Sequence, residues 1–299
     1  DMKGGDVIIL QALTALKEAG ALDAMHVVAY FSGDEEDAGR PLTEARRVLR
    51  AVAQGAVAAI GLENGAGDPA TAVVARRGAT NWELRTSGTA GHASQIFRED
   101  IGAGAVFEAS RILSAFYTTL AGEPLLAFNP GLILGGSNLM LTGEGAAGTA
   151  DGKHNVIARH AVVTGDIRTI SAEQLARTKA AMEKIVAQHL PHTTATITFD
   201  EGYPPLPPSA GNERLLALYD RASRDLGTGP VRGVDPARAG AADVAFIHGI
   251  VPMIIDGVGL SGKNDHSDQE TADLRQLPIK SKRLALLLHR LTREQTPRP

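Results

Sequence analysis

The sequence predicts an α/β protein in which a smaller α+β domain interrupts a larger α/β domain. Near both ends of the chain, helical apolar spacing alternates with short apolar runs, which is typical of a mainly parallel sheet covered by helices. The middle of the chain is richer in strand-like segments, and a proline-rich stretch at 203–208 marks the return to the first pattern. We therefore expect one domain made of residues 1–75 and 204–299, and an inserted domain made of residues 76–203.

The first part of the larger domain has two predicted helices and two predicted strands. Apolar residues at helical spacing predict helices over 4–19 and 42–53, and Gly20 ends the first of them. Apolar runs predict buried strands over 26–31 and 57–62. Helix and strand therefore alternate from the start of the chain.

The remaining elements follow the same patterns. The middle of the chain predicts strands at 71–77, 81–86, 125–134, 156–169 and 194–199, and helices at 103–120 and 172–189. After the proline-rich stretch, the pattern predicts a helix from residue 213, a strand at 251–255 and a helix at 279–291.

The composition excludes several classes of function. The chain has 299 residues and a mass of 31.3 kDa, and its 30 basic and 34 acidic residues give a net charge of −4 with no basic run. Nucleic acid and anionic membranes are therefore not expected as partners. No apolar run approaches the roughly 20 residues that a membrane helix needs. The absence of cysteine excludes disulfides and thiolate metal sites, so any metal must be held by His, Asp or Glu.

The beginning of the chain leaves its compartment open. The sequence opens on Asp1-Met2-Lys3 without an initiator Met, so no signal peptide can be read. We expect that a longer parent protein has lost its N-terminal part. Cytoplasmic, periplasmic and secreted locations all remain compatible with the sequence.

Four consecutive acids, at 34–37, directly follow the predicted strand over 26–31. Open α/β sheets bind ligands at the carboxyl ends of their strands, and like charges gathered there favour a bound cation. One interpretation is a pair of carboxylates with separate roles, a metal ligand and a base. The other is a solvated acidic loop.

Four further residues are candidates, each with a simpler alternative. Asp1 precedes a helix and could be its N-cap, and Glu63 ends a strand and could be a surface residue. His266 lies in an acid-rich loop after a predicted strand, as a metal ligand or as an exposed histidine. His92 lies in a loop of small residues, but the chain has no G-x-S-x-G sequence to accompany a serine triad.

Seven short motifs occur in a familiar order. They are Asp1-Met-Lys-Gly-Gly, Gly33-Asp-Glu-Glu, Glu63, Gly91-His-Ala-Ser, Asn155-Val-Ile, Asp166-Ile-Arg and His266-Ser. Together they resemble the di-zinc aminoacylase/carboxypeptidase family of metallopeptidases, which includes glutamate carboxypeptidase, acetylornithine deacetylase and succinyl-diaminopimelate desuccinylase. The resemblance implies a zinc-peptidase-like catalytic domain interrupted by an inserted lid. It also implies a homodimer formed through that lid domain.

The resemblance assigns roles to the acidic residues and to His266. Asp1 would bridge two zinc ions, with Glu36 and His266 completing one zinc site and Glu63 belonging to the other. Glu35 would be the general base that takes a proton from the metal-bound water. Asp243 matches a family Gly-Thr-Asp-Ala stretch that here reads Gly-Ala-Ala-Asp, which leaves its role open.

The resemblance assigns roles to three residues of the inserted domain. His92 would reach the active site of a partner subunit and stabilise the tetrahedral oxyanion there. Arg168, with Asn155 nearby, would bind the substrate carboxylate, a role that suits a planar guanidinium.

The chain departs from the family at its front. The family has a His-x-Asp motif upstream of the bridging Asp, with strands of the central sheet, and this chain begins at Asp1. The expected function is zinc-dependent hydrolysis of an amide or peptide bond next to a free carboxylate, by an exopeptidase or an N-acyl-amino-acid deacylase. The intact family would hold two zinc ions per subunit and this chain one or none. The alternatives are a single-metal hydrolase and an inactive fragment or non-enzymatic dimerising relative.

Overall fold

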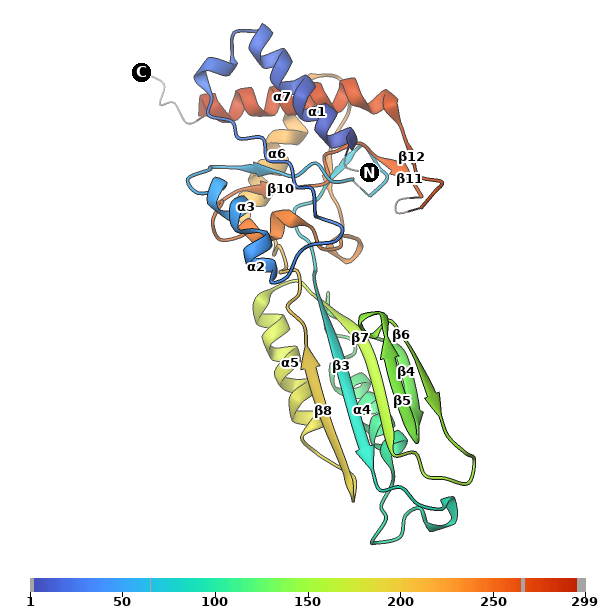
Figure 1. The fold of residues 1–299 in the computed structure, drawn as a ribbon. Helices are drawn as coiled ribbons and strands as arrows, with labels where there is room; N and C mark the ends of the chain where they lie inside the picture. Colours follow the sequence, from blue (N-terminus) through green and yellow to red (C-terminus); the bar gives the residue numbers. More distant parts are fainter. Residues whose placement is uncertain (1–2, 65, 265–266, 295–299) are drawn as a thin grey trace. The chain divides into compact units, whose positions relative to one another are not determined.

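The computed structural model describes residues 3–64, 66–264 and 267–294, and the chain forms two compact units (Figure 1). Unit 1 comprises Asp1–Arg77 and Tyr203–Pro299, and unit 2 comprises Gly78–Gly202. The chain therefore passes between the units at 77/78 and 202/203. The sequence placed these divisions at 75/76 and 203/204.

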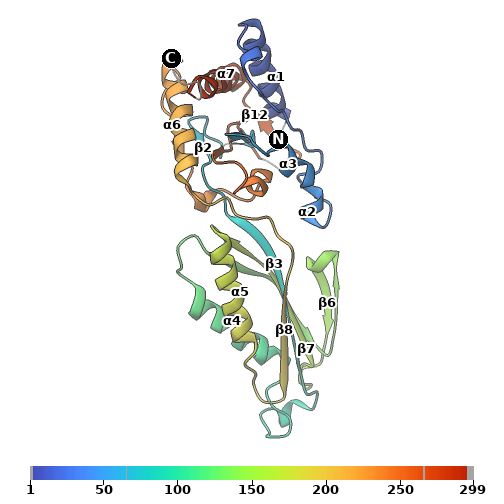
Figure 2. The same ribbon diagram turned by 90° about the vertical axis from the view of Figure 1, so that its left-hand side faces the viewer.

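Three long helices of unit 1 lie close to their predicted positions. They are α1 (Lys3–Glu18), α6 (Ala210–Asp225) and α7 (Leu277–Glu294). Helix α1 buries Ile8, Ala12 and Leu16, which are spaced four residues apart and form one face of the helix. It ends as predicted at Gly20, whose positive φ of 65° suits a helix terminus. Helices α1 and α7 pack against each other in the core of the unit, as Figures 1 and 2 show.

The strands of unit 1 are short and mainly parallel. Strand β1 (Ala59–Ile60) pairs in parallel with β10 (Ile254–Ile255), and β2 (Thr71–Ala72) pairs in parallel with β9 (Arg232–Gly233). A small antiparallel pair is formed by β11 (Gly262–Lys263) and β12 (Thr271–Ala272). The α/β class with a mainly parallel arrangement is confirmed.

The predicted helix over 42–53 is two helices, α2 (Leu42–Ala45) and α3 (Arg47–Val52). The interruption falls at Arg46, whose φ of −99° and ψ of 10° leave the helical region. The Arg46 side chain is fully buried and hydrogen-bonded to residues outside both helices. Its tertiary contacts therefore coincide with a break that the apolar pattern does not indicate.

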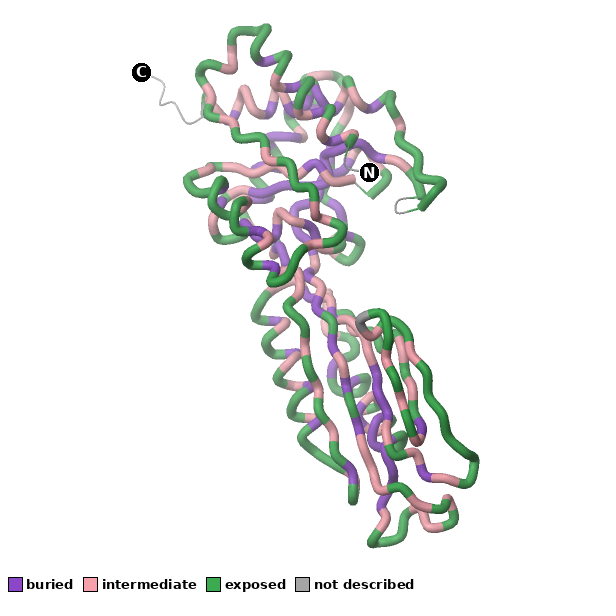
Figure 3. Tube along the Cα trace, viewed as in Figure 1, coloured by how far each residue is buried: buried purple, intermediate pink, exposed green. Residues whose placement is uncertain are grey.

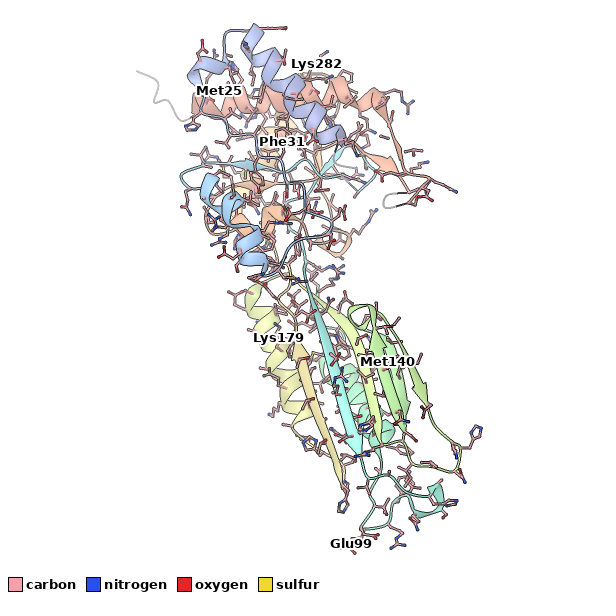
Figure 4. The ribbon with its side chains drawn as sticks, viewed as in Figure 1. Met25, Phe31, Glu99, Met140, Lys179 and Lys282 are labelled. Carbon is pink, nitrogen blue, oxygen red and sulfur yellow. The ribbon has the colours of Figure 1, made fainter. Side chains whose placement is uncertain are left out.

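The predicted strand over 26–31 is wrong. These residues form no strand, and none of the described residues pairs with them in a ladder. Val28 and Phe31 are 54% and 50% exposed, and Figure 4 labels Phe31 in this segment. The segment lines an apolar cavity of about 660 Å³ together with residues of 52–63, α1 and α7. An apolar run becomes a strand only where a neighbouring strand pairs with its backbone groups.

Unit 2 is an antiparallel sheet with two helices on one face. Its strands are β3 (Gly78–Gly88), β4 (Ala127–Gly136), β7 (His160–Thr169) and β8 (Thr193–Phe199), in the order β4-β7-β3-β8. Helices α4 (Ala105–Leu120) and α5 (Ala172–Val186) cover one face of the sheet (Figure 2). Trp82 and Phe116 meet edge-on in the core between them, with ring centroids 5.9 Å apart. Figure 3 shows that the buried positions of the sheet lie mainly in its central strands, β3 and β7.

The sequence did not predict one hairpin of unit 2. Strands β5 (Asn138–Thr142) and β6 (Ala147–Asp151) pair with each other, and Met140 of β5 is 60% exposed (Figure 4). Glycines at the turn obscured the strand pattern. On another edge of the unit, Lys179 lies 5.1 Å from the ring centroid of Phe199.

Six short 3₁₀ turns complete the described structure, at Leu22–Ala24, Ala93–Gln95, Gly143–Gly145, Pro236–Arg238, Asp243–Ile247 and Leu274–Gln276. None of the helices in the described ranges combines the length and the apolar composition that crossing a bilayer requires.

Candidate active site

Three of the predicted acidic residues line one cavity in unit 1. Glu35, Glu36 and Glu63 lie around a space of about 330 Å³, and Arg76 and Arg238 line the same space. Asp1 and His266, the other two predicted metal ligands, lie outside the described residues. The structure therefore brings Glu35 and Glu36 of the acidic run close to Glu63, the acid predicted to end a strand.

The short parallel strands position Glu63. Strand β1 runs beside β10 with Ile60 opposite Ile255, so Glu63 and Asp256 both follow the carboxyl ends of adjacent strands. This edge of a parallel arrangement is where α/β folds place their ligand sites. The prediction that Glu63 lies at such an edge is confirmed.

Asp256 is a residue of this site that the sequence analysis missed. Its side chain is completely buried, and its Oδ1 atom accepts hydrogen bonds from the main-chain amides of Glu63 at 3.3 Å and Gly257 at 2.7 Å. Its Oδ2 atom accepts a 2.8 Å bond from Arg76 Nε. The available signal was an Asp that directly follows the apolar run at 253–255.

The carboxyl groups of the cavity repel one another. Burial, together with the charges of Asp256 and Glu35, raises the pKa of Glu63 to about 8. Burial and the charges of Asp243 and Glu36 likewise raise the pKa of Glu35 above its ordinary value. Partly buried acids with raised pKa values in one cavity are typical of a functional site.

A second set of side chains surrounds the loop that holds Glu35. We call it the Arg46 cluster, and it consists of Arg46, Asp34, Asp243 and Tyr203. Arg46 Nη1 donates to both carboxylate oxygens of Asp34 at 3.0 Å, and its Nε donates to Asp243 Oδ1 at 2.6 Å. Its Nη2 donates to the Asp34 carbonyl and to the Tyr203 hydroxyl, each at 3.0 Å. This cluster, apart from Asp34 and Asp243, was not identified from the sequence.

The charges of the cluster affect its own acids differently. Hydrogen bonds from Ser32 and Arg46 lower the pKa of Asp34 below its ordinary value. Burial raises the pKa of Asp243, although its bond to Arg46 acts in the opposite direction. Burial and the charge of Asp243 raise the pKa of Tyr203 to about 12, so this phenol keeps its proton and can donate a hydrogen bond.

The donor chemistry of the cavity fits a divalent metal. Within the described ranges, no group of three or more His, Asp or Glu side chains is arranged to hold an ion. Two of the predicted ligands are outside those ranges, and the other two, Glu36 and Glu63, are carboxylates that line the same cavity. Because burial and the neighbouring acidic charges raise the pKa of Glu63, a cation would stabilise the charged carboxylates.

Unit 2 contains His92, Asn155 and Arg168. His92 caps the turn at Ala93–Gln95, and its Nδ1 atom lies 2.8 Å from the Ser94 hydroxyl. The main chain of Asn155 lies beside it, because the Ala93 amide donates to the Asn155 carbonyl at 2.8 Å. His92 and Asn155 are therefore neighbours.

The expectation that Asn155 lies near Arg168 is wrong within this chain. Asn155 precedes the start of β7, whereas Arg168 lies near its other end, opposite Ala79 and Ala127. A strand advances about 3.3 Å per residue, so the eight residues from His160 to Arg168 alone span about 26 Å. The Arg168 guanidinium instead binds Asp166 at 2.6 Å.

Comparisons with known proteins agree with this fold. The model of a family described as peptidase family M20/M25/M40 matches residues 1–290. Carboxypeptidase G2 of Pseudomonas sp. (strain RS-16) is 25% identical over 285 residues, which cover 93% of this chain and 62% of that protein. The chain thus spans less than two thirds of the length of this curated relative.

Solved structures resemble the whole fold. Aminopeptidase PepT of Bacillus cereus superimposes with a TM-score of 0.70 at 17% identity, over 97% of this chain and 70% of that one. A Bacillus subtilis protein described as a dinuclear metal-binding peptidase of the M20 family gives a TM-score of 0.63 at 19% identity, over 96% of this chain and 70% of that one.

Proposed function

Because this chain belongs to peptidase family M20/M25/M40, we propose that the protein hydrolyses an amide or peptide bond next to a free carboxylate, with zinc as its metal. It would act as an exopeptidase or as an N-acyl-amino-acid deacylase. The observation that supports this proposal most directly is the gathering of Glu35, Glu36 and Glu63 around one cavity, where burial and repulsion raise the pKa values of Glu35 and Glu63. The cavity also has the exposed Arg238 in its wall, which favours an anionic substrate.

Glu36 and Glu63 would hold the metal, together with Asp1 and His266. When bound, zinc would supply Lewis-acid polarisation of the scissile carbonyl and lower the pKa of water. Glu35 would accept the proton of the attacking water at its carboxylate and pass it to the leaving nitrogen. A raised pKa suits this role, because a general base works best when its pKa approaches the working pH.

The residues of unit 2 would bind the substrate. Arg168 would pair with the free carboxylate, and His92 of the partner subunit would donate a hydrogen bond to the developing oxyanion. Asn155 lies beside His92, so it would contribute a further polar contact from that same partner subunit.

We also propose a homodimer formed through unit 2. Strand β4 is at the edge of its sheet, and α4 exposes Val106, Phe107 and Tyr117 by 42%, 51% and 69%. An exposed strand edge and an exposed apolar helix face are both typical of surfaces that pair with another chain. Light scattering on the wild type and on Phe107→Asp tests this: the wild type should have twice the mass of one chain, and the variant should move toward a single chain. A wild type of one-chain mass would contradict the dimer.

The test of the proposed activity is a measurement of zinc per chain combined with hydrolysis of two substrate panels. One panel holds peptides with a C-terminal glutamate, and the other holds N-acyl amino acids. We expect bound zinc and release of the C-terminal residue or of the acyl group. A dimeric protein with neither zinc nor hydrolysis would instead favour a non-enzymatic relative, and one zinc per chain with activity would favour a single-metal hydrolase.

A further inference from the structure

We propose that Tyr203 is a positioning residue for Glu35, acting through the main chain of the loop that bears it. This inference rests on the proposed function in which Glu35 is the general base. Tyr203 lies where the chain re-enters unit 1, far in sequence from the acidic loop. Its phenol nevertheless makes two hydrogen bonds within unit 1, and both lead to that loop.

The first step of the argument is the directionality of the phenol. The Tyr203 hydroxyl donates to the Glu35 carbonyl at 3.0 Å and accepts from Arg46 Nη2 at 3.0 Å. Its ring packs edge-on against Phe246, with centroids 5.0 Å apart. A phenol has one proton to donate, and the guanidinium can only donate, so Arg46 determines that the Tyr203 proton points toward Glu35.

The second step is that both peptide groups flanking Glu35 are held. Arg46 Nη2 donates to the carbonyl of Asp34, which belongs to the peptide group before the Glu35 Cα atom. Tyr203 donates to the carbonyl of Glu35, which belongs to the peptide group after it. Each peptide group is planar, so two restrained groups restrain φ and ψ of the residue between them. The Arg46 cluster therefore restrains the direction in which the Glu35 side chain leaves the main chain.

The third step is that the cluster is rigid. Arg46 is completely buried, and it is bound on its other side by Asp34 and Asp243. Asp34 closes the loop by accepting from the Ser32 hydroxyl at 2.9 Å and from the Gly39 amide. A buried and fully paired guanidinium holds its partners more precisely than a solvated one.

The test is Tyr203→Phe, which removes one oxygen and keeps the ring that packs on Phe246. A misplacement of about 1 Å can lower a rate about 100-fold, so we expect kcat to fall about 10- to 100-fold. KM should stay within twofold, and zinc per chain should be unchanged, because Tyr203 does not line the cavity of Glu35, Glu36 and Glu63 and its hydroxyl bonds to Arg46 and the Glu35 carbonyl.

The matched control is Tyr219→Phe. Tyr219 is a buried tyrosine of α6 whose hydroxyl bonds to Arg283, remote in the fold from the Arg46 cluster. This variant should lower Tm while leaving kcat unchanged. A wild-type kcat in Tyr203→Phe, or an equal loss of kcat in both variants, would overturn the positioning role.

A second measurement keeps this inference separate from the proposed activity. Hydrogen exchange of peptides covering 33–40 includes the Gly39 amide, which is bonded to Asp34. We expect at least fivefold faster exchange in Tyr203→Phe and no change in Tyr219→Phe. If the wild type hydrolyses no substrate, the proposed function fails while the exchange still reports on the loop. Unchanged exchange in Tyr203→Phe would overturn the inference whatever the activity.

Discussion

Arg76 and Asp256 form a buried ion pair of 2.8 Å although they are 180 residues apart in the sequence. Their side chains are 8% and 0% exposed. The second oxygen of the Asp256 carboxylate accepts the main-chain amide of Glu63, and Arg76 also donates to the Gly240 carbonyl at 2.9 Å. One ion pair thus joins the strand ends that border the candidate active site.

The pair leads to a prediction about stability. Asp256→Asn removes the charge that Arg76 faces and leaves a buried guanidinium unpaired, so the free energy of unfolding should fall by about 3–5 kcal/mol. Urea denaturation measures this change. The matched control is Glu44→Gln, which breaks the exposed Glu44–Arg47 pair and should cost less than about 1 kcal/mol. Equal effects of the two substitutions would show that burial of the Arg76 pair is unimportant.

A second prediction concerns the general base. Glu35→Gln should lower kcat by about 100- to 10,000-fold, because an amide cannot accept the proton of the attacking water. Zinc per chain should remain at the wild-type value, since Glu35 is not a predicted ligand. Steady-state kinetics and elemental analysis check both statements. Retained turnover would remove Glu35 from the base role, and Glu44→Gln again serves as an exposed control.

The third prediction concerns recognition of the substrate carboxylate. Arg168→Ala should raise KM about 10- to 100-fold and change kcat little, as expected for the loss of a charged hydrogen bond made in the ground state. Arg85→Ala is the control, because Arg85 is also in unit 2 and also paired with an acid two residues away. An unchanged KM in Arg168→Ala, with a raised KM in Arg238→Ala, would move the carboxylate site to the cavity wall of unit 1.

The fourth prediction concerns pH. Glu108 is a buried acid of α4 that accepts hydrogen bonds from Arg111 and from the Leu190 amide. Burial by itself would raise its pKa, but these bonds keep the pKa of Glu108 below its ordinary value. Glu108 therefore contributes stability above the unfolded-state pKa of about 4.3, and this contribution is lost as the pH falls through the lower folded-state pKa.

Thermal unfolding between pH 3 and 6 tests this assignment. The wild type should lose stability as the pH falls, and Glu108→Gln should be less stable near pH 6 and less dependent on pH. Glu183→Gln, an exposed substitution on α5, should keep the wild-type profile. A wild-type profile in Glu108→Gln would contradict the role of Glu108.

The sequence by itself determined the long helices and the class of the fold. The apolar spacing that predicts α1, α4, α5 and α7 is local, and tertiary packing buries the faces that this spacing defines. The order of the short motifs was likewise sufficient to identify the family, which the match of the family model to residues 1–290 confirms.

The tertiary structure decided which apolar runs are strands. Residues 26–31 have the composition of a strand and are not one, whereas β1 forms beside β10 with only two paired residues. A strand depends on hydrogen bonds to a neighbour that can lie anywhere in the sequence. Local composition therefore cannot decide its existence.

The tertiary structure also decided which polar residues belong to the site. Tyr203, Arg46 and Asp243 meet around Glu35 from segments up to 197 residues apart, and Asn155 and Arg168 separate although they are close in sequence. A buried charge is stable only where it finds its partners. Folding brings those partners together from distant parts of the chain. For this reason the sequence indicated the acids of the site, and only the structure identified the side chains that hydrogen-bond to them.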